Sequence, residues 1–378
     1  MKRTLWRLSI ATSAAVAVLL TAACGNGSSD DDASSGAKVD LSAAQQTIAP
    51  LTKRPTKFPI TEPLAERPTA GTTVAYLDIG TPVSGQVYGQ LKQAAQVLGV
   101  TLQRVQTGQS PQDINAAMNT LVESRPAAVI DLAIDPALFT PQLKALQKQG
   151  TVFVAQSIVN GEQFGLDDKQ IAFGAAGSKA NGKVLTSALL AKTDGKATDL
   201  AFYNVPELPF SALMLEGAKE QLAEQCSGCE LRVVDIPITQ VGSTAARTIV
   251  SDLQAHPDTE AFIASVDELQ IGLPAAMKVA GVDVPGMGLG ATPVNLQQIA
   301  AGQERGALVA DYAMLAWVTM DKALRELAGQ KYDHSFWTKA NPGVAQVVTE
   351  DNVPSDPDAG YIAFPDYKER FTKLWTGR

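Results

Sequence analysis

Short apolar runs alternate with longer amphipathic stretches between residues 73 and 156. The run 73–77 predicts a buried strand. Apolar residues then recur at the spacing of one helix face, at Val87, Leu91, Ala94, Ala95 and Leu98. A second helix is expected after Ser110, which can cap it, with Pro111 in the first helical position. The other expected elements are strands at 100–105, 127–134 and 152–156 and a helix at 136–148. The elements expected between residues 73 and 156 predict a parallel sheet covered by helices, which forms the first half of the protein.

The same alternation restarts after the polar stretch 160–169. The expected elements are strands at 199–204, 231–236 and 261–265 and helices at 211–225 and 244–255. A second sheet of the same kind is therefore predicted. Two such halves create a cleft bordered by the carboxyl ends of their strands, which is where open α/β sheets bind ligands.

The first 23 residues have the pattern of an export signal peptide. Lys2, Arg3 and Arg7 precede an apolar core at 10–20 and small residues at 21–23. That core is about half of the ~20 residues that a membrane-spanning helix needs. Cys24 follows directly, as in the bacterial lipobox, and is predicted to be lipidated, although Thr21 replaces the usual Leu; the alternative is an ordinary signal peptide with an incidental cysteine.

Residues 24–71 are rich first in Ser, Asp and Gly and then in Pro. Such a composition buries too little apolar surface to fold alone, so this segment is predicted to be a flexible tether. The stretch "LSAAQQTIAPL" within it can form a short helix.

Composition and charge exclude several classes of function. The 378 residues are 45% hydrophobic, enough for one large core or two medium ones. A net charge of −8 and a pI near 5.0 disfavour nucleic acid as a partner, since phosphates require clustered Lys and Arg. His256 and His334 lie far apart, which leaves little material for a His-based metal site or a Ser-His-Asp nucleophile. We therefore expect no catalytic site, no metal and no cofactor.

Two short motifs have a structural interpretation. Cys226 and Cys229 form a C-x2-C pair after an expected helix, which in an exported chain favours a small disulfide over a redox or zinc site. "GMGLGA", at 286–291, superficially matches a dinucleotide-binding pattern, but its glycines are expected within a strand rather than before a phosphate-binding helix.

Three stretches resemble a known family: "GQLKQAAQVLG", "HPDTEAFIASVDE" and "GALVADYAMLAWVTMDKALRELAG". Over residues 72–350 the chain is similar to type I periplasmic substrate-binding proteins, in particular the sugar-binding lipoproteins of bacterial ABC importers related to ribose-binding protein. The resemblance implies an α/β fold of two Rossmann-like lobes, each a parallel sheet flanked by helices, joined by a hinge with three crossings near Ile171, Asp311 and Ala345. Lobe 1 would span 72–171 with 311–345, lobe 2 would span 172–310 with 346–352, and the helical segment 353–378 would pack on the body.

The resemblance also suggests ligand-binding positions, carried over one residue at a time. These are Ser84, Tyr88, Asp135, Gln156, Asn204, Phe210, Asp267 and Asp311. Tyr88 and Phe210 would offer flat apolar contact. Asp135 and Asp267 have the alternative role of helix caps. Where the family often has an Asp-Arg pair this chain has Gln156 and Ser157, and Ala212 and Val266 replace two other polar positions. Without an arginine, the cleft should disfavour organic anions.

The resemblance thus implies an extracytoplasmic solute-binding lipoprotein that is not an enzyme. It would capture a small sugar or sugar-like compound, act as a monomer and deliver the ligand to an ABC permease. A lipid such as palmitate on Cys24 would hold it at the outer face of the bacterial cytoplasmic membrane. The alternatives are a sensory receptor of the same fold and an importer component for an amine or aromatic ligand.

Overall fold

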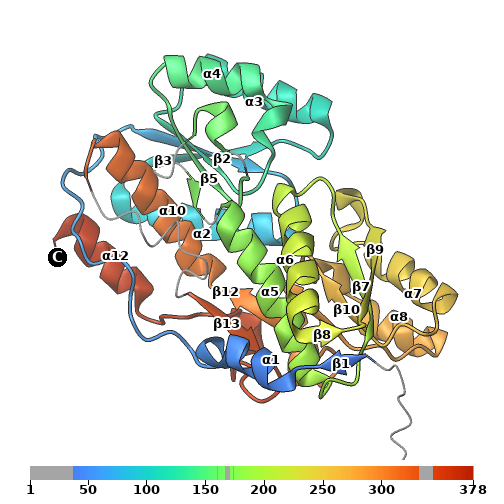
Figure 1. Cartoon of the computed structure of the whole chain (residues 1–378). Coiled ribbons are helices and arrows are strands. Elements are labelled where there is room, and N and C mark those ends of the chain that lie inside the picture. Colours follow the sequence, from blue (N-terminus) through green and yellow to red (C-terminus); the bar gives the residue numbers. More distant parts are fainter. Residues whose placement is uncertain (1–36, 160, 167–170, 173, 332–343, 378) are drawn as a thin grey trace, which may run out of the picture. The chain divides into compact units, whose positions relative to one another are not determined.

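The computed structural model describes residues 37–159, 161–166, 171–172, 174–331 and 344–377 (Figure 1). The expected signal peptide, Cys24 and the tether up to residue 36 lie outside these described residues. Within them the strands form a five-stranded, a six-stranded and a two-stranded sheet. The predicted α/β class, with parallel sheets flanked by helices, is confirmed.

The first lobe is built on the five-stranded sheet, which is parallel throughout in the order β3-β2-β4-β5-β6. Its strands are β2 (Thr73–Asp78), β3 (Thr101–Gln106), β4 (Ala128–Asp131), β5 (Val152–Gln156) and β6 (Ile171–Ala172). Its helices are α2 (Pro82–Leu98), α3 (Pro111–Ser124), α4 (Thr140–Lys148) and α10 (Tyr312–Leu327). Val74 and Tyr76 share a core with α2 and α10, whereas Ala75 and Leu77 share one with α3 and α4. Both faces of the sheet are therefore covered, as its apolar strands require.

Two boundaries in this lobe differ from the prediction. The strand expected at 127–134 ends at Asp131, because its carboxylate accepts a hydrogen bond from Ile134 N at 3.0 Å and turns the chain. The helix expected at 136–148 is interrupted at Phe139, whose φ of −141° separates a short 3-10 turn, η2 (Pro136–Leu138), from α4. The break places the Phe139 ring in the core beside Phe153, with 5.9 Å between the ring centroids.

The second lobe is built on the six-stranded sheet, in the order β13-β12-β11-β10-β7-β9. Its strands are β7 (Asp199–Asn204), β9 (Glu230–Asp235), β10 (Ala261–Ala264), β11 (Gly286–Leu289), β12 (Gly306–Ala310) and β13 (Ala345–Val348). The pairing is parallel except between β12 and β13. Its helices are α5 (Ala175–Lys192), α6 (Pro209–Gln225), α7 (Ala245–Ala255), α8 (Leu273–Ala280) and α9 (Pro293–Ala300). The glycines of "GMGLGA" lie in β11 and the turn after it, as expected.

The helices α5 and α6 lie side by side, and two glycines set their separation (Figure 1). A Cβ atom at Gly182 would come within 1.9 Å of the Met214 carbonyl oxygen, and one at Gly217 within 2.0 Å of the Lys179 carbonyl oxygen. These positions require glycine because backbone meets backbone there.

The chain passes from β6 into α5, from β12 into α10 and back into β13. Asp311 starts α10, accepting a hydrogen bond from Met314 N at 2.8 Å. The final helix, α12 (Tyr367–Thr376), buries Phe371 and Trp375 in the core that also contains α2 and α10.

Residues 37–71, which we call the N-terminal strap, do not form the flexible tether that composition predicts. The strand β1 (Lys38–Val39) pairs with β8 (Cys226–Ser227), and α1 (Leu41–Ile48) packs on α5. Farther along, Phe58 and Leu64 are buried in the core of the first lobe. The prediction was wrong here because a Pro-rich segment with a few apolar side chains can fold onto a surface that already exists.

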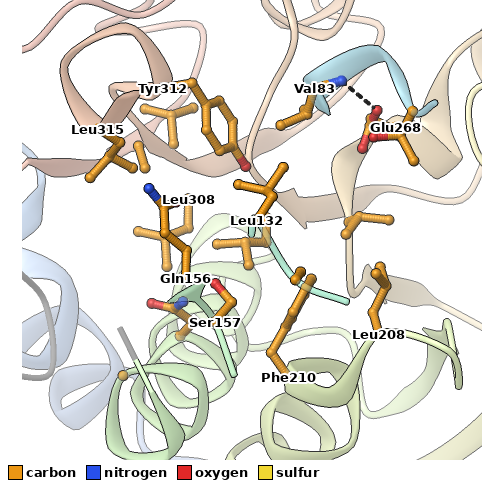
Figure 2. Close-up of a pocket in the computed structure, with 18 of the residues that line it drawn as sticks. Val83, Leu132, Gln156, Ser157, Leu208, Phe210, Glu268, Leu308, Tyr312 and Leu315 are labelled. Atoms are coloured by element: carbon orange, nitrogen blue, oxygen red, sulfur yellow. Dashed lines mark hydrogen bonds between the residues drawn. The ribbon is translucent and has the colours of Figure 1, made fainter. Parts of the chain in front are cut away.

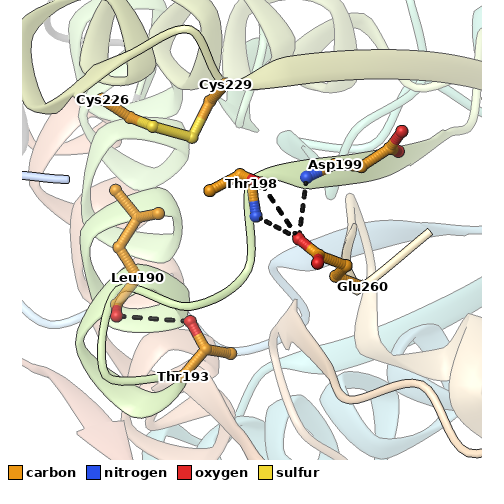
Figure 3. Close-up of a disulfide and its surroundings, with 7 residues drawn as sticks. All are labelled: Leu190, Thr193, Thr198, Asp199, Cys226, Cys229 and Glu260. Carbon is orange, nitrogen blue, oxygen red and sulfur yellow. Dashed lines mark hydrogen bonds between the residues drawn. A yellow bond between two sulfur atoms is a disulfide. The ribbon is translucent and has the colours of Figure 1, made fainter. Parts of the chain in front are cut away.

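A disulfide joins Cys226 and Cys229 at the end of α6, with 5.5 Å between their Cα atoms (Figure 3). The closed turn presents the edge to which β1 pairs. No helix within the described ranges is long and apolar enough to cross a membrane.

Candidate ligand-binding site

A cavity of about 130 Å³ lies among residues of both lobes (Figure 2). From the first lobe it is lined by residues that end or follow β2, β4 and β5, such as Ile79, Leu132 and Gln156. From the second lobe come residues after β7 and β10, such as Phe210 and Glu268, and residues of β11 and β12. The carboxyl ends of strands from both sheets thus surround one space, which is the predicted place for a ligand. The volume is several times the ~10–15 Å³ that one water needs.

Most of the lining side chains are apolar. Figure 2 shows Leu132, Leu208, Phe210, Leu308 and Leu315 around the space. Leu208 and Phe210 start α6 and are 7% and 8% exposed, so they are largely enclosed. A ligand in this cavity will therefore make most of its contacts through apolar surface.

The polar lining side chains are few. They are Thr81, Gln156, Ser157, Asn181, Glu268 and Tyr312. The Gln156 amide nitrogen donates to Thr319 Oγ1 on α10, which orients the amide. Ser157 has a φ of 55°, in the left-handed region that favours glycine, so its backbone is held in a strained conformation at the pocket wall.

Glu268 is the carboxylate of the pocket. It lies in the short 3-10 turn η5 (Asp267–Gln270) and is 5% exposed. Its Oε1 accepts a hydrogen bond from Val83 N at 3.0 Å, so this side chain connects the second lobe to the start of α2 in the first. Burial raises the pKa of Glu268 to about 7, although the Val83 hydrogen bond opposes the shift.

A pair of buried carboxyl groups next to Glu268 does not line the pocket. Asp267 and Glu304 are 0% and 5% exposed and share a hydrogen bond. Gln270 Nε2 donates to Asp267 Oδ1 at 2.6 Å, and Asn295 Nδ2 lies 3.3 Å from Glu304 Oε2. Burial and the neighbouring Asp267 raise the pKa of Glu304 well above its ordinary value, which favours a proton shared within the pair.

Of the eight positions expected from the sequence, Gln156 and Phe210 line this cavity. Three of the others serve the first lobe and lie outside the lining. Ser84 bonds to the Tyr76 hydroxyl at 3.1 Å and to the Asp78 carboxylate. Tyr88 stacks on Tyr76, and the Arg104 guanidinium lies 4.5 Å from its ring centroid.

Asp135 caps η2, accepting from Ala137 N at 2.9 Å, as its alternative role predicted. The structure thus uses these three side chains for packing and capping in the first lobe.

Three further expected positions, Asn204, Asp267 and Asp311, also lie outside the lining because other groups engage their side chains. Asn204 donates to Asp235 Oδ1 at 2.7 Å and accepts from Ser211 Oγ at 2.5 Å. Asp267 bonds with Gln270 rather than capping a helix. Asp311 accepts from Met314 N and Ala363 N, each at 2.8 Å, and burial raises its pKa to about 6.

Glu268 and Tyr312 line the pocket but were missed by the sequence reasoning. Each follows an expected residue, Asp267 and Asp311, by one position. Successive side chains at a strand end point in different directions, so an error of one residue exchanges a pocket position for an interior one. The acidic "DEL" turn after a strand was the available signal.

Among the described residues, no three or more His, Cys, Asp or Glu side chains are placed together to hold a metal ion. The two lobes with a ligand-sized cavity between them define a solute-binding protein. The chain matches the periplasmic binding protein domain family over residues 74–331, more than half of its length, and belongs to that family. The expected resemblance is confirmed, and the family is one of extracytoplasmic binding proteins rather than enzymes.

Solved structures share the fold at low sequence identity. The 5-methylthioribose transporter solute-binding protein of Thermotoga lettingae, in complex with 5-methylthioribose, is 16% identical with a TM-score of 0.66, covering 85% of this chain and 99% of its own. The arabinose transporter binding protein of Shewanella sp. ANA-3, bound to L-arabinofuranose, is 18% identical with a TM-score of 0.61, covering 79% and 95%. An ABC sugar transporter subunit of Rhodobacter sphaeroides is 17% identical with a TM-score of 0.60, covering 75% and 99%. No curated protein matches the chain.

Proposed function

We propose that this protein captures a small sugar-like solute between its lobes and delivers it to an ABC import permease. The cavity lined by both lobes carries this proposal. The neighbours solved with 5-methylthioribose and L-arabinofuranose support a solute of that size and class. A ligand that contacts both lobes favours the arrangement in which they close around it, and a permease can recognise that arrangement.

The rim of the cavity supports closure around a ligand. Glu268 Oε1 accepts from Val83 N across the lobes. Close by, a Cβ atom at Gly242 would lie 2.8 Å from Pro82 Cγ. Backbone of the second lobe therefore approaches the start of α2 directly, with no side chain between them.

The test is thermal unfolding of the purified full chain with pentoses, hexoses, polyols and their deoxy, thio and amino derivatives. A ligand that binds only the folded state adds about 2.7 kcal/mol at 100 times its Kd. Ala133→Trp fills the cavity and should abolish the stabilisation, whereas Val279→Trp, at a position 90% exposed, should leave it intact. Stabilisation that persists in Ala133→Trp would place the ligand elsewhere and contradict the proposal.

The proposal includes a lipid anchor on Cys24. Replacing Cys24 with Ser should release the protein from the membrane fraction into the medium. Unchanged membrane association of the Cys24→Ser protein would contradict the anchor while leaving ligand capture untouched.

A further inference from the structure

The first relevant feature of the cavity is its shortage of hydrogen-bonding groups. The polar lining consists of Thr81, Gln156, Ser157, Asn181, Glu268 and Tyr312, and Gln156 already donates to Thr319. Each hydroxyl of a sugar is both a donor and an acceptor, and a buried hydroxyl without a partner costs free energy. A molecule with a hydroxyl on nearly every carbon would place several of them against the Leu and Val side chains of the wall. The lining therefore fits a solute with a largely apolar body.

The second feature is the charge at Glu268. Its carboxylate receives one hydrogen bond from the residues described, from Val83 N at 3.0 Å. The described lining contains no Lys, Arg or His. Elsewhere in the protein a buried carboxylate is matched by arginine: Arg325 bonds to Asp321 at 2.7 Å. A buried carboxylate requires a positive partner or a proton, so Glu268 depends on a proton, and a positively charged solute in the cavity can take the place of that proton.

Two aromatic side chains complete this environment. Tyr312 and Phe210 both line the cavity, and Figure 2 shows the Tyr312 hydroxyl directed toward the middle of the lining residues. The Tyr312 hydroxyl lies close against Gly290, where a Cβ atom would come within 2.0 Å of it, so this position of the hydroxyl requires glycine at residue 290. A hydroxyl oxygen can accept a hydrogen bond from an ammonium group, and aromatic rings attract cations.

We infer that the solute has a largely apolar body and one protonated amine that pairs with the Glu268 carboxylate. This inference rests on the proposed function, because it takes the cavity as the solute site. It narrows the sugar-like solute to a deoxygenated amino sugar. Simple alicyclic amines share the same chemistry, an apolar ring with one ammonium group. The raised pKa of Glu268 agrees with it, since a bound ammonium would restore the charge that burial disfavours.

The test compares ligands that differ only in charge, by calorimetric titration of the full chain. The pairs are cyclohexylamine with cyclohexanol, and a 3-amino-2,3,6-trideoxyhexose with its N-acetyl derivative. We expect each amine to bind at least 10-fold more tightly than its neutral partner. Cyclohexanecarboxylate should not bind at a concentration that saturates with the amine.

Glu268→Gln isolates the charge, because the amide oxygen can still accept from Val83 N. This variant should weaken the binding of each amine at least 10-fold more than it weakens the binding of the neutral partner. The matched control is Glu207→Gln, since the exposed Glu207 also accepts a backbone N–H, from Ile238 at 3.3 Å, but lies outside the lining. It should retain the preference for amines in full.

The possible outcomes separate the two proposals. Equal binding of amine and neutral partner, or an amine preference that survives in Glu268→Gln, overturns the inference. Binding of ordinary sugars without amines, abolished by Ala133→Trp, overturns the inference and leaves the proposed function standing. If no member of either panel binds, both proposals fall.

Discussion

Two sets of buried carboxyl groups are stabilised in opposite ways: the single Asp321 in the core of the first lobe, and the pair Asp267 and Glu304 beside the cavity. Asp321 on α10 accepts hydrogen bonds from Arg325 Nε at 2.7 Å and from Trp375 Nε1 at 2.7 Å. The Asp321 and Arg325 side chains are 2% and 1% exposed. Burial raises the pKa of Asp321, and Arg325 and Trp375 oppose that shift. Asp267 and Glu304 have each other and amide groups as partners.

The difference separates a structural role from a ligand-dependent one. The charge of Asp321 is balanced within the chain, since Arg325 lies one turn farther along the same helix. The group beside the cavity depends on protons, or on a cation from outside, to offset burial. Chemistry that responds to a ligand or to pH is therefore expected at the cavity and not in the core.

The largest effect is expected from Arg325→Met. Removing one partner of a buried ion pair leaves an uncompensated charge and costs about 3–5 kcal/mol. Arg325 Nη2 also donates to the Glu62 backbone oxygen at 2.6 Å, so the N-terminal strap should loosen as well. Chemical unfolding in urea measures the loss.

Asp321→Asn combined with Arg325→Met provides the control, because it removes both charges. The double variant should be more stable than Arg325→Met alone. If Arg325→Met costs less than about 1 kcal/mol, Arg325 does not balance a charge on Asp321, and the contrast between the two groups is lost.

The next effect is a fall in stability as the pH rises from 5 to 8. The pKa of Glu268 is raised by burial from 4.5 to about 7, so the folded state binds more protons than the unfolded state between these values. At 1.36 kcal/mol per pKa unit, Glu268 alone lowers the free energy of unfolding by about 3 kcal/mol across this interval. Asp311, whose pKa burial raises to about 6, acts in the same direction.

Urea unfolding at half-unit pH steps measures this profile, and Glu268→Gln should flatten it. Asp78 provides the internal contrast. Burial would raise its pKa, but hydrogen bonds from Ser84, Gly80 N and Arg104 outweigh burial and hold the pKa below its ordinary value. Its contribution is therefore lost only as the pH falls below about 4. A stability that is constant or rising from pH 5 to 8 would show that Glu268 does not carry its proton into the folded state.

A smaller effect separates two tryptophans in the same core. Trp375 and Trp317 stack with 5.1 Å between ring centroids, but Trp375 Nε1 donates to Asp321 whereas Trp317 Nε1 has no partner in the part of the chain that the structure describes. Both lose similar packing on replacement by Phe. Trp375→Phe should therefore cost about 1–2 kcal/mol more than Trp317→Phe, because it also removes a hydrogen bond to a charged group. Equal losses would mean that this hydrogen bond adds nothing to the Asp321 group.

The fold could be predicted from the sequence because it depends on patterns that repeat. Strands β5 and β7 match their predicted bounds, and Ser110 caps α3 as expected. The site could be predicted only in part, because the pattern identifies the strand end but not which of two successive side chains faces the cavity. Glu268 and Tyr312 were missed for that reason, while Gln156, at the end of β5, lies in the cavity lining.

The N-terminal strap could not be predicted from its own composition. Its order comes from contacts distant in sequence, such as Leu64 N bonding to the Leu374 oxygen at 2.9 Å and Gln330 Nε2 to the Pro63 oxygen at 3.0 Å. Composition reports whether a segment can fold alone, and this segment does not need to.

The smallest effect is expected from Glu304→Gln, in the group beside the cavity. If Glu304 is protonated, its O–H donates to Asp267, and the Gln amide nitrogen can donate in its place while the amide oxygen accepts from Asn295 Nδ2. Stability at pH 6 should then change by less than about 1 kcal/mol, whereas Glu304→Ala, which removes one buried partner from Asn295 and one from Asp267, should cost more than about 2 kcal/mol. Urea unfolding of the two variants makes the comparison. A Glu304→Gln loss as large as that of Glu304→Ala would show that the pair requires a negative charge at Glu304. A shared proton would then not explain how the pair tolerates burial, and the contrast with Asp321 would be lost.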